Sequence, residues 1–180
     1  MFNLPQPSMA LNSHDVPPPD YKMWNTYKVS ADTTPDHMLG WTAKVAGDVR
    51  GGLRCVVFNS HGLPEWLGIG TGITPPQANL FKILSGKVNT IFIVACEIAE
   101  IGSTNFDGNL FCGAIAKASG ATVFCSTALQ STYLYPIIGL PFGSIDEYEG
   151  IVYRYNRDGS NRAVNNDYIR SYVRKLRLGL

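Results

Sequence analysis

Short apolar runs bounded by turn residues recur along this chain, and segments with helical periodicity separate them. The strand-sized runs cover residues 54–60, 88–95 and 121–127, and a further strand is expected over residues 149–155. Apolar residues recur at helical spacing within residues 35–49, 74–84, 107–119 and 168–176. Continuous runs of this length are typical of strands covered on both faces, as in a parallel sheet. The alternation of strand and helix therefore predicts an α/β fold with a mainly parallel central sheet.

The segments outside this pattern predict the domain organisation. Residues 1–20 hold five of the eleven prolines and little apolar periodicity, which indicates an extended or loosely docked N-terminal arm. Residues 21–180 then form a single α/β domain, in which residues 23–31 alternate like a strand at the sheet edge. The stretch 133–142, within a loop that follows the third core strand, is expected to line a pocket or to serve as a docking surface.

Composition narrows the class of protein and its partners. At 180 residues with 45% hydrophobic and 16% charged positions, the chain fits one soluble globular domain. A formal net charge of +1 gives no reason to expect a nucleic-acid partner. The apolar stretches are too short for a membrane span, and residues 1–5 lack the features of a signal peptide. We expect a cytoplasmic protein by default, or one exported by a route without a classical signal peptide.

Two of the apolar runs end directly in reactive side chains. The run over residues 54–60 continues into His61-Gly62, and the run over residues 88–95 continues into Cys96. The segment between the two runs is long enough for a crossover helix, so the strands are expected to be parallel and close. Their carboxyl ends would then open on the sheet edge where α/β proteins place their active sites. The pair predicts a cysteine hydrolase, with a peptidase as the leading interpretation.

Each residue of this pair has a chemical role. The His61 imidazole can accept the proton of the Cys96 thiol and pass it to a leaving amine. Gly62 has no side chain, so a substrate carbonyl can approach the backbone beside it. The N–H groups of Gly62 and Cys96 are therefore the candidate oxyanion hole.

Residues next to the strand ends complete the candidate site. Glu97, Ser126 and Thr127 are expected near the pocket because of their strand-end positions. Asn59 shares a strand face with His61, but a polar residue at a strand end needs no catalytic reason. The sequence therefore assigns no third member to the pair.

The other cysteines and the histidines do not indicate a metal site. Cys55, Cys112 and Cys125 lie within apolar segments, where a free cysteine behaves as a small hydrophobe. The sequence has no C-x-x-C spacing, and its three histidines are scattered. The glycines near residue 70 do not form a dinucleotide fingerprint. We expect reduced thiols, no metal and no cofactor.

The paired motifs resemble those of the caspase-like (clan CD) cysteine peptidases, which include caspases, legumains, gingipains and CHAT domains. The motifs are the apolar blocks ending in His61-Gly62 and in Ala95-Cys96, and the run over residues 111–127 is similar to the helix and strand that follow the nucleophile in CHAT-like and related bacterial domains. The resemblance implies a three-layer caspase-like α/β sandwich, a His61–Cys96 dyad and no cofactor. It does not extend to a caspase-type arginine pair, so specificity for aspartate is not implied.

Three functions remain open at this point. The first is a cysteine endopeptidase with a protein or peptide substrate, such as a bacterial effector or a processing enzyme. The second is a non-catalytic caspase-like module that binds protein. The third is a cysteine-dependent hydrolase or acyltransferase that acts on a small molecule.

Overall fold

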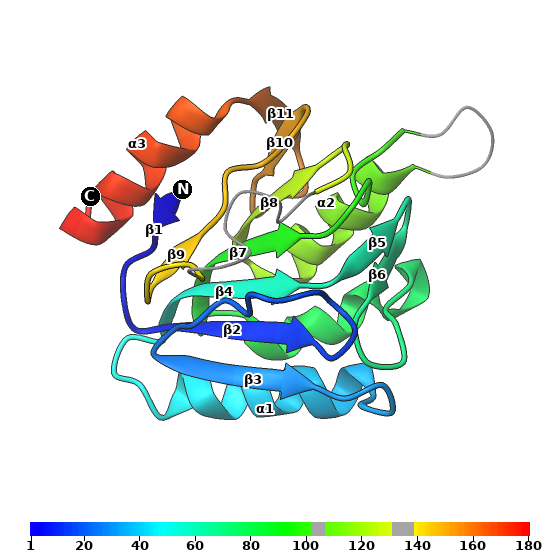
Figure 1. Ribbon diagram of the computed structural model, residues 1–180, viewed down its shortest axis with the longest axis horizontal. Helices are drawn as coiled ribbons and strands as arrows, with labels where there is room; N and C mark the ends of the chain where they lie inside the picture. Colours follow the sequence, from blue (N-terminus) through cyan, green and yellow to red (C-terminus); the bar gives the residue numbers. More distant parts are fainter. Residues whose placement is uncertain (102–106, 131–138) are drawn as a thin grey trace.

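A seven-stranded sheet forms the centre of the protein (Figure 1). The computed structural model describes residues 1–101, 107–130 and 139–180. The strand order is β11-β10-β8-β7-β4-β2-β3. The strands are β2 (Ser8–Ser13), β3 (Asn25–Val29), β4 (Leu53–Asn59), β7 (Val88–Val94), β8 (Thr122–Ser126), β10 (Val152–Tyr155) and β11 (Asn161–Val164). The first five are parallel to one another, and β10 pairs antiparallel with both β8 and β11, which confirms a mainly parallel sheet.

Helices cover both faces of this sheet. The helices are α1 (Pro35–Gly47), the 3-10 helix η1 (Pro75–Leu84), α2 (Gly108–Ser119) and α3 (Asn166–Leu178). Side chains of α1, η1 and α2 join one apolar core with one face of the sheet, and α3 contributes to a second core on the other face. No helix within the described residues is long and apolar enough to cross a membrane.

Two small two-stranded units complete the fold. β1 (Phe2–Asn3) pairs with β9 (Ser144–Ile145) on the α3 face of the sheet. β5 (His61–Leu63) and β6 (Trp66–Gly68) form a hairpin directly after β4. Figure 1 shows this hairpin at the end of the sheet toward which β2, β4 and β7 point.

The central strands are apolar on both faces because both faces are covered. On β4, Val56 and Phe58 enter the core with α1, η1 and α2, while Cys55 and Val57 enter the core with α3. All four side chains are fully buried. This two-sided burial is why the strands read as continuous apolar runs in the sequence.

The prediction of an N-terminal arm over residues 1–20 is wrong. Strand β2 lies inside the sheet between β3 and β4, and all six of its residues are buried. The prolines stand before and after this strand, so none of them interrupts its hydrogen-bond ladder. The strand escaped notice because half of its residues are polar, as its sequence SMALNS shows.

A hydrogen-bond network satisfies the buried polar side chains of this region. The Asn12 amide donates to the Tyr21 carbonyl at 3.0 Å, and its oxygen accepts from the Tyr21 N–H, also at 3.0 Å. The same oxygen accepts from the Asn59 amide at 2.9 Å. Asn12 therefore joins β2 to β4 and to the segment that leads into β3.

The chain reverses its direction of travel across the sheet at the edge strand β3. It moves from β2 to β3 through a connection whose residues Tyr21 and Met23 pack on the α3 face. It then returns over the opposite face through α1 to β4 and moves on through η1 to β7. Neighbouring strands β2 and β4 thus send their connections to opposite faces, which is the place where open α/β sheets form their binding crevices.

Asn12→Ala is expected to lower the free energy of unfolding by about 2–4 kcal/mol, because it leaves buried groups of Asn59 and Tyr21 without partners. Urea denaturation measures this change. Asn25→Ala on the edge strand β3 is the matched control, since the Asn25 side chain makes no hydrogen bond to the described residues. We expect the control to change stability by no more than about 0.5 kcal/mol. Equal effects of the two variants would contradict a structural role for the network.

Candidate active site at the carboxyl edge of the sheet

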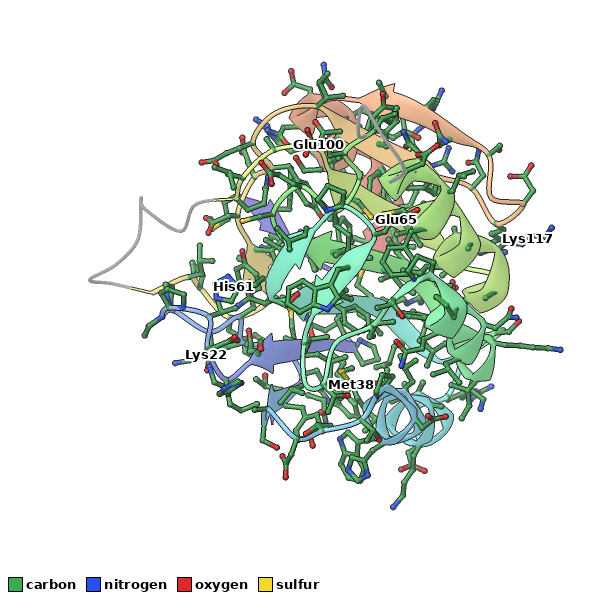
Figure 2. All side chains as sticks on the ribbon, turned by 90° about the vertical axis from the view of Figure 1, so that its right-hand side faces the viewer. Lys22, Met38, His61, Glu65, Glu100 and Lys117 are labelled. Carbon is green, nitrogen blue, oxygen red and sulfur yellow. The ribbon has the colours of Figure 1, made fainter. Side chains whose placement is uncertain are left out.

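The pairing of β4 with β7 brings His61 and Cys96 to the same level of the sheet. Asn59 lies opposite Val94 in the parallel register, and the two reactive residues follow two positions later on each strand. Figure 2 looks onto this edge of the sheet, with His61 labelled. The His61 side chain is exposed and Cys96 is half-buried. The predicted neighbourhood of the two strands is confirmed.

The Gly62 backbone packs directly against Cys96. A methyl group added at Gly62 would lie 2.5 Å from the Cys96 carbonyl oxygen, 2.9 Å from the Ala95 side chain and 3.3 Å from the Cys96 nitrogen. Only glycine allows this approach without a shift of the hairpin. The contact holds the backbone beside His61 against the backbone of Cys96.

Hydrogen bonding in the hairpin leaves the Gly62 N–H pointing away from β6. Leu67, which lies opposite Gly62, exchanges both of its backbone hydrogen bonds with Ile73, at 3.0 and 2.9 Å. Because ladder bonds alternate along an antiparallel pair, Gly62 and Leu67 form a non-hydrogen-bonded pair. The Gly62 N–H is therefore outside the hairpin ladder, as an oxyanion donor must be.

Glu65 ties the tip of the same hairpin to helix α2. Its carboxylate accepts the N–H of Asp107 at 3.1 Å, and Asp107 in turn caps α2 by accepting the N–H groups of Asn109 and Leu110. Glu65 is labelled in Figure 2 on the hairpin above His61. The strand that carries His61 is thus fixed at both of its ends.

Asp15, in the connection that follows β2, holds the His61 ring. The ring Nε2 lies 3.4 Å from the Asp15 carbonyl oxygen, a long hydrogen bond in which the imidazole must be the donor. This bond favours the tautomer with the proton on Nε2. It leaves Nδ1 as the nitrogen that can exchange a proton with a thiol.

The Asp15 carboxylate adds a negative charge beside this ring. Partial burial acts to raise the pKa of the Asp15 carboxyl. The hydrogen bond from the Ser13 hydroxyl, at 2.6 Å, a backbone hydrogen bond and the nearby imidazoles of His61 and His14 outweigh that effect and hold the pKa below its usual value. The carboxylate is therefore ionised at neutral pH and places a negative charge at this edge of the sheet.

Gln130 holds the sulfur of Cys96. The Gln130 N–H donates to Sγ at 3.4 Å, and Sγ lies 3.8 Å from the Gln130 carbonyl oxygen. The Gln130 side chain is fixed in turn, since its amide donates to the carbonyls of Ala128 and Glu149 at 2.9 and 3.2 Å. The Cys96 sulfur is therefore held by the backbone of Gln130.

The residue after Cys96 has a left-handed backbone. Glu97 has φ of 51°, a conformation that residues other than glycine rarely adopt, and its N–H donates to the Ala128 carbonyl at 3.1 Å. Strained positions of this kind cluster at functional sites. Here the turn carries the chain sharply away just after the thiol and leaves Cys96 half-buried at the strand end.

The remaining predicted site residues hold loops in place. The Ser126 hydroxyl donates to the Glu149 carbonyl, and the Thr127 hydroxyl donates to the Ile151 carbonyl at 3.2 Å. Both lie at the end of β8, as expected, but their hydroxyls are committed to the backbone. Asn59 is likewise engaged with Asn12 rather than with His61. Most of the predicted pocket loop, residues 133–138, lies outside the described residues.

The reactive side chains are held by neighbours and not by each other. Among the described residues, the His61 ring bonds to Asp15 and the Cys96 thiol bonds to Gln130. Catalytic hydrogen bonds are often long or absent before substrate binds. The described residues contain no group of three or more His, Cys, Asp or Glu side chains placed to hold a metal. The Cys96 thiol and the His61 imidazole supply a nucleophile and a proton acceptor at this edge.

Sequence reasoning missed Asp15 and Gln130. Both act chiefly through backbone atoms, which every residue possesses, so their side chains carried no signal. The position of Asp15 depended in addition on β2, which was not recognised as a strand. The sequence offered one signal for Asp15, namely its position two residues after Ser13.

Comparisons with protein-family models, with curated proteins and with solved structures find no match to this chain. Its function is therefore inferred from the geometry of its own residues.

Gly62→Ala is expected to lower the free energy of unfolding by about 1–3 kcal/mol, because the added methyl group meets the backbone of Cys96. Thermal or urea denaturation measures the loss. Gly40→Ala in helix α1 is the control, since a methyl group there meets nothing within 4 Å. It should raise stability by about 0.5–1 kcal/mol. An unchanged stability for Gly62→Ala would show that the hairpin is not packed against Cys96.

Proposed function

We propose that the protein is a caspase-like cysteine peptidase in which Cys96 is the nucleophile and His61 the proton-transfer residue. One observation carries the proposal: adjacent parallel strands deliver both residues to one level of the sheet edge, with the Gly62 backbone packed against Cys96. The edge lies beside the junction of β2 and β4, where α/β sheets bind their ligands. The resemblance of the two strand-end motifs to clan CD peptidases points to the same chemistry.

The reaction divides into two acyl-transfer steps. The thiolate of Cys96 attacks the carbonyl carbon of a peptide bond, and protonated His61 gives its proton to the departing amine. Water then attacks the thioester, with His61 taking its proton, and the acid product leaves with Cys96 regenerated. In both steps the N–H groups of Gly62 and Cys96 face the oxygen on which negative charge develops.

Two neighbours hold the dyad in place. The Gln130 N–H donates to the Cys96 sulfur, and the Asp15 carbonyl accepts from the His61 ring. An unperturbed thiol is only a few per cent ionised at neutral pH, so the proposed reaction depends on proton transfer from Cys96 to His61.

The surroundings of the dyad suit an extended peptide. Two exposed apolar side chains are near the dyad in the sequence. Leu63 lies two residues after His61, and Leu129 directly precedes Gln130. Apolar side chains at the margin of an open edge offer contacts to the side chains of a peptide on either side of the cleaved bond. A docked protein that is not cleaved would use the same contacts, so chemistry at Cys96 must decide between the two.

Cleavage of a diverse peptide library should disappear in Cys96→Ala and fall by about 100- to 10,000-fold in His61→Ala, because each removes one half of the dyad. Mass spectrometry of the products gives the rates and the cut sites. His37→Ala, an exposed histidine on α1, should leave cleavage unchanged. Cleavage that survives in Cys96→Ala would overturn the proposal, and turnover of simple esters without peptides would favour a small-molecule hydrolase.

Iodoacetamide should alkylate Cys96 selectively in the folded protein at neutral pH. The other three thiols are fully buried, and burial raises the pKa of Cys55 to about 12 and that of Cys125 well above its usual value. We expect His61→Ala to slow alkylation of Cys96 by roughly 10-fold, since the thiolate loses its counter-ion. Peptide mapping identifies the modified residue. Equal rates in the wild type and His61→Ala would favour a binding module without an activated thiol.

A further inference from the structure

A cavity lies at the opposite end of the strands that carry the candidate active site. Its volume is about 750 Å³, and it lies between the amino ends of β4, β7 and β8, the turn after β10 and the last turns of α3. Figure 1 shows α3 ending on the side where β4 begins, away from the β5–β6 hairpin. The side chains used below are Arg54, Arg154, Arg157, Asp158, Tyr172 and Lys175. The cavity shares no residue with the candidate active site.

The lining of this cavity is strongly basic. It contains three arginines and one lysine but a single acidic side chain, that of Asp158. Within the described part of the chain, none of the four cations forms an ion pair. The Asp158 carboxylate accepts from the Ser160 N–H at 2.9 Å and from the Ser160 hydroxyl at 2.6 Å. The side chains of the lining therefore carry a net positive charge.

Arg154 lines this cavity and has one donor without a partner. Its Nε is buried and has no hydrogen-bond partner among the described residues. The guanidinium lies over the Tyr172 ring, 5.7 Å from the centroid, and the Tyr172 hydroxyl lies 2.8 Å from the Thr90 hydroxyl. A buried charged donor without a partner costs stability unless something supplies an acceptor. The Tyr172 ring, which also lines the cavity, holds the guanidinium at the cavity wall.

We propose that this cavity binds a small, soluble anion that bears phosphate groups. Guanidinium groups match phosphate oxygens with paired N–H donors, and Lys175 adds a mobile point charge. The volume falls in the range of small-molecule sites. The concave shape and the weak net charge of the whole chain, +1, favour a compact ligand over a nucleic-acid strand.

Pyrophosphate is the first probe, and isothermal titration calorimetry on the full chain is the measurement. We expect saturable binding at one site, with Lys175→Gln and Arg154→Gln each weakening the affinity by about 10-fold or more. Lys175 is exposed on α3, so its substitution should leave the fold intact even if Arg154→Gln disturbs β10.

Arg174→Gln is the matched control for Lys175→Gln. It removes the same charge from the neighbouring exposed position on α3, but Arg174 does not line the cavity. Its affinity for pyrophosphate should stay within about 2-fold of the wild type, because surface charges beyond direct contact are screened. If both variants weaken pyrophosphate binding equally, the attraction is a general effect of positive charge on α3. That result would overturn the proposed site.

Two further outcomes would also overturn the proposal. Absence of saturable pyrophosphate binding would mean that the basic lining is only a solvated surface. Binding to phosphatidylcholine vesicles that contain a phosphoinositide, without binding of pyrophosphate, would assign the cavity to a lipid headgroup at a membrane surface. Cys96→Ala should bind pyrophosphate like the wild type. The result for this cavity therefore does not depend on whether the peptidase proposal is correct.

Discussion

The parallel pairing of β4 with β7 is the constraint on which both ends of the molecule depend. At the carboxyl ends it sets His61 level with Cys96, and at the amino ends it sets Arg54 and Asn89 at the mouth of the basic cavity. A slip of one residue would turn every side chain of a strand to the other face. The apolar residues on both faces of the two strands belong to different cores, so each core opposes such a slip.

Prediction from sequence succeeded where burial leaves a pattern and failed where it does not. β4, β7 and β8 were predicted because strands covered on both faces are continuously apolar. β2 is equally buried, but its polar Ser8 and Asn12 accept hydrogen bonds from Cys55 and Asn59, which lie far along the sequence, and no local pattern reveals such bonds. The placement of His61 and Cys96 at one edge followed from strand order alone. The groups that hold them, on Asp15 and Gln130, lie in loops whose path no sequence pattern indicated.

The candidate active site is built mainly from backbone. Gly62 contributes an N–H and a close approach, Asp15 a carbonyl, and Gln130 an N–H toward sulfur. Such groups are positioned by the sheet and by the loops that it anchors, so they need little reorganisation when charge develops on a substrate. The basic cavity differs in kind, because its character comes from charged side chains that converge from separate elements.

The interior position of β2 has a consequence for the order in which the sheet forms during synthesis. Strand β2 has β3 as its only neighbour until β4, which ends at Asn59, has also been made. A two-stranded parallel pair is not stable alone. The apolar side chains of Met9 and Leu11 therefore stay unprotected while more than forty further residues emerge, and the nascent chain depends on β4 to cover them.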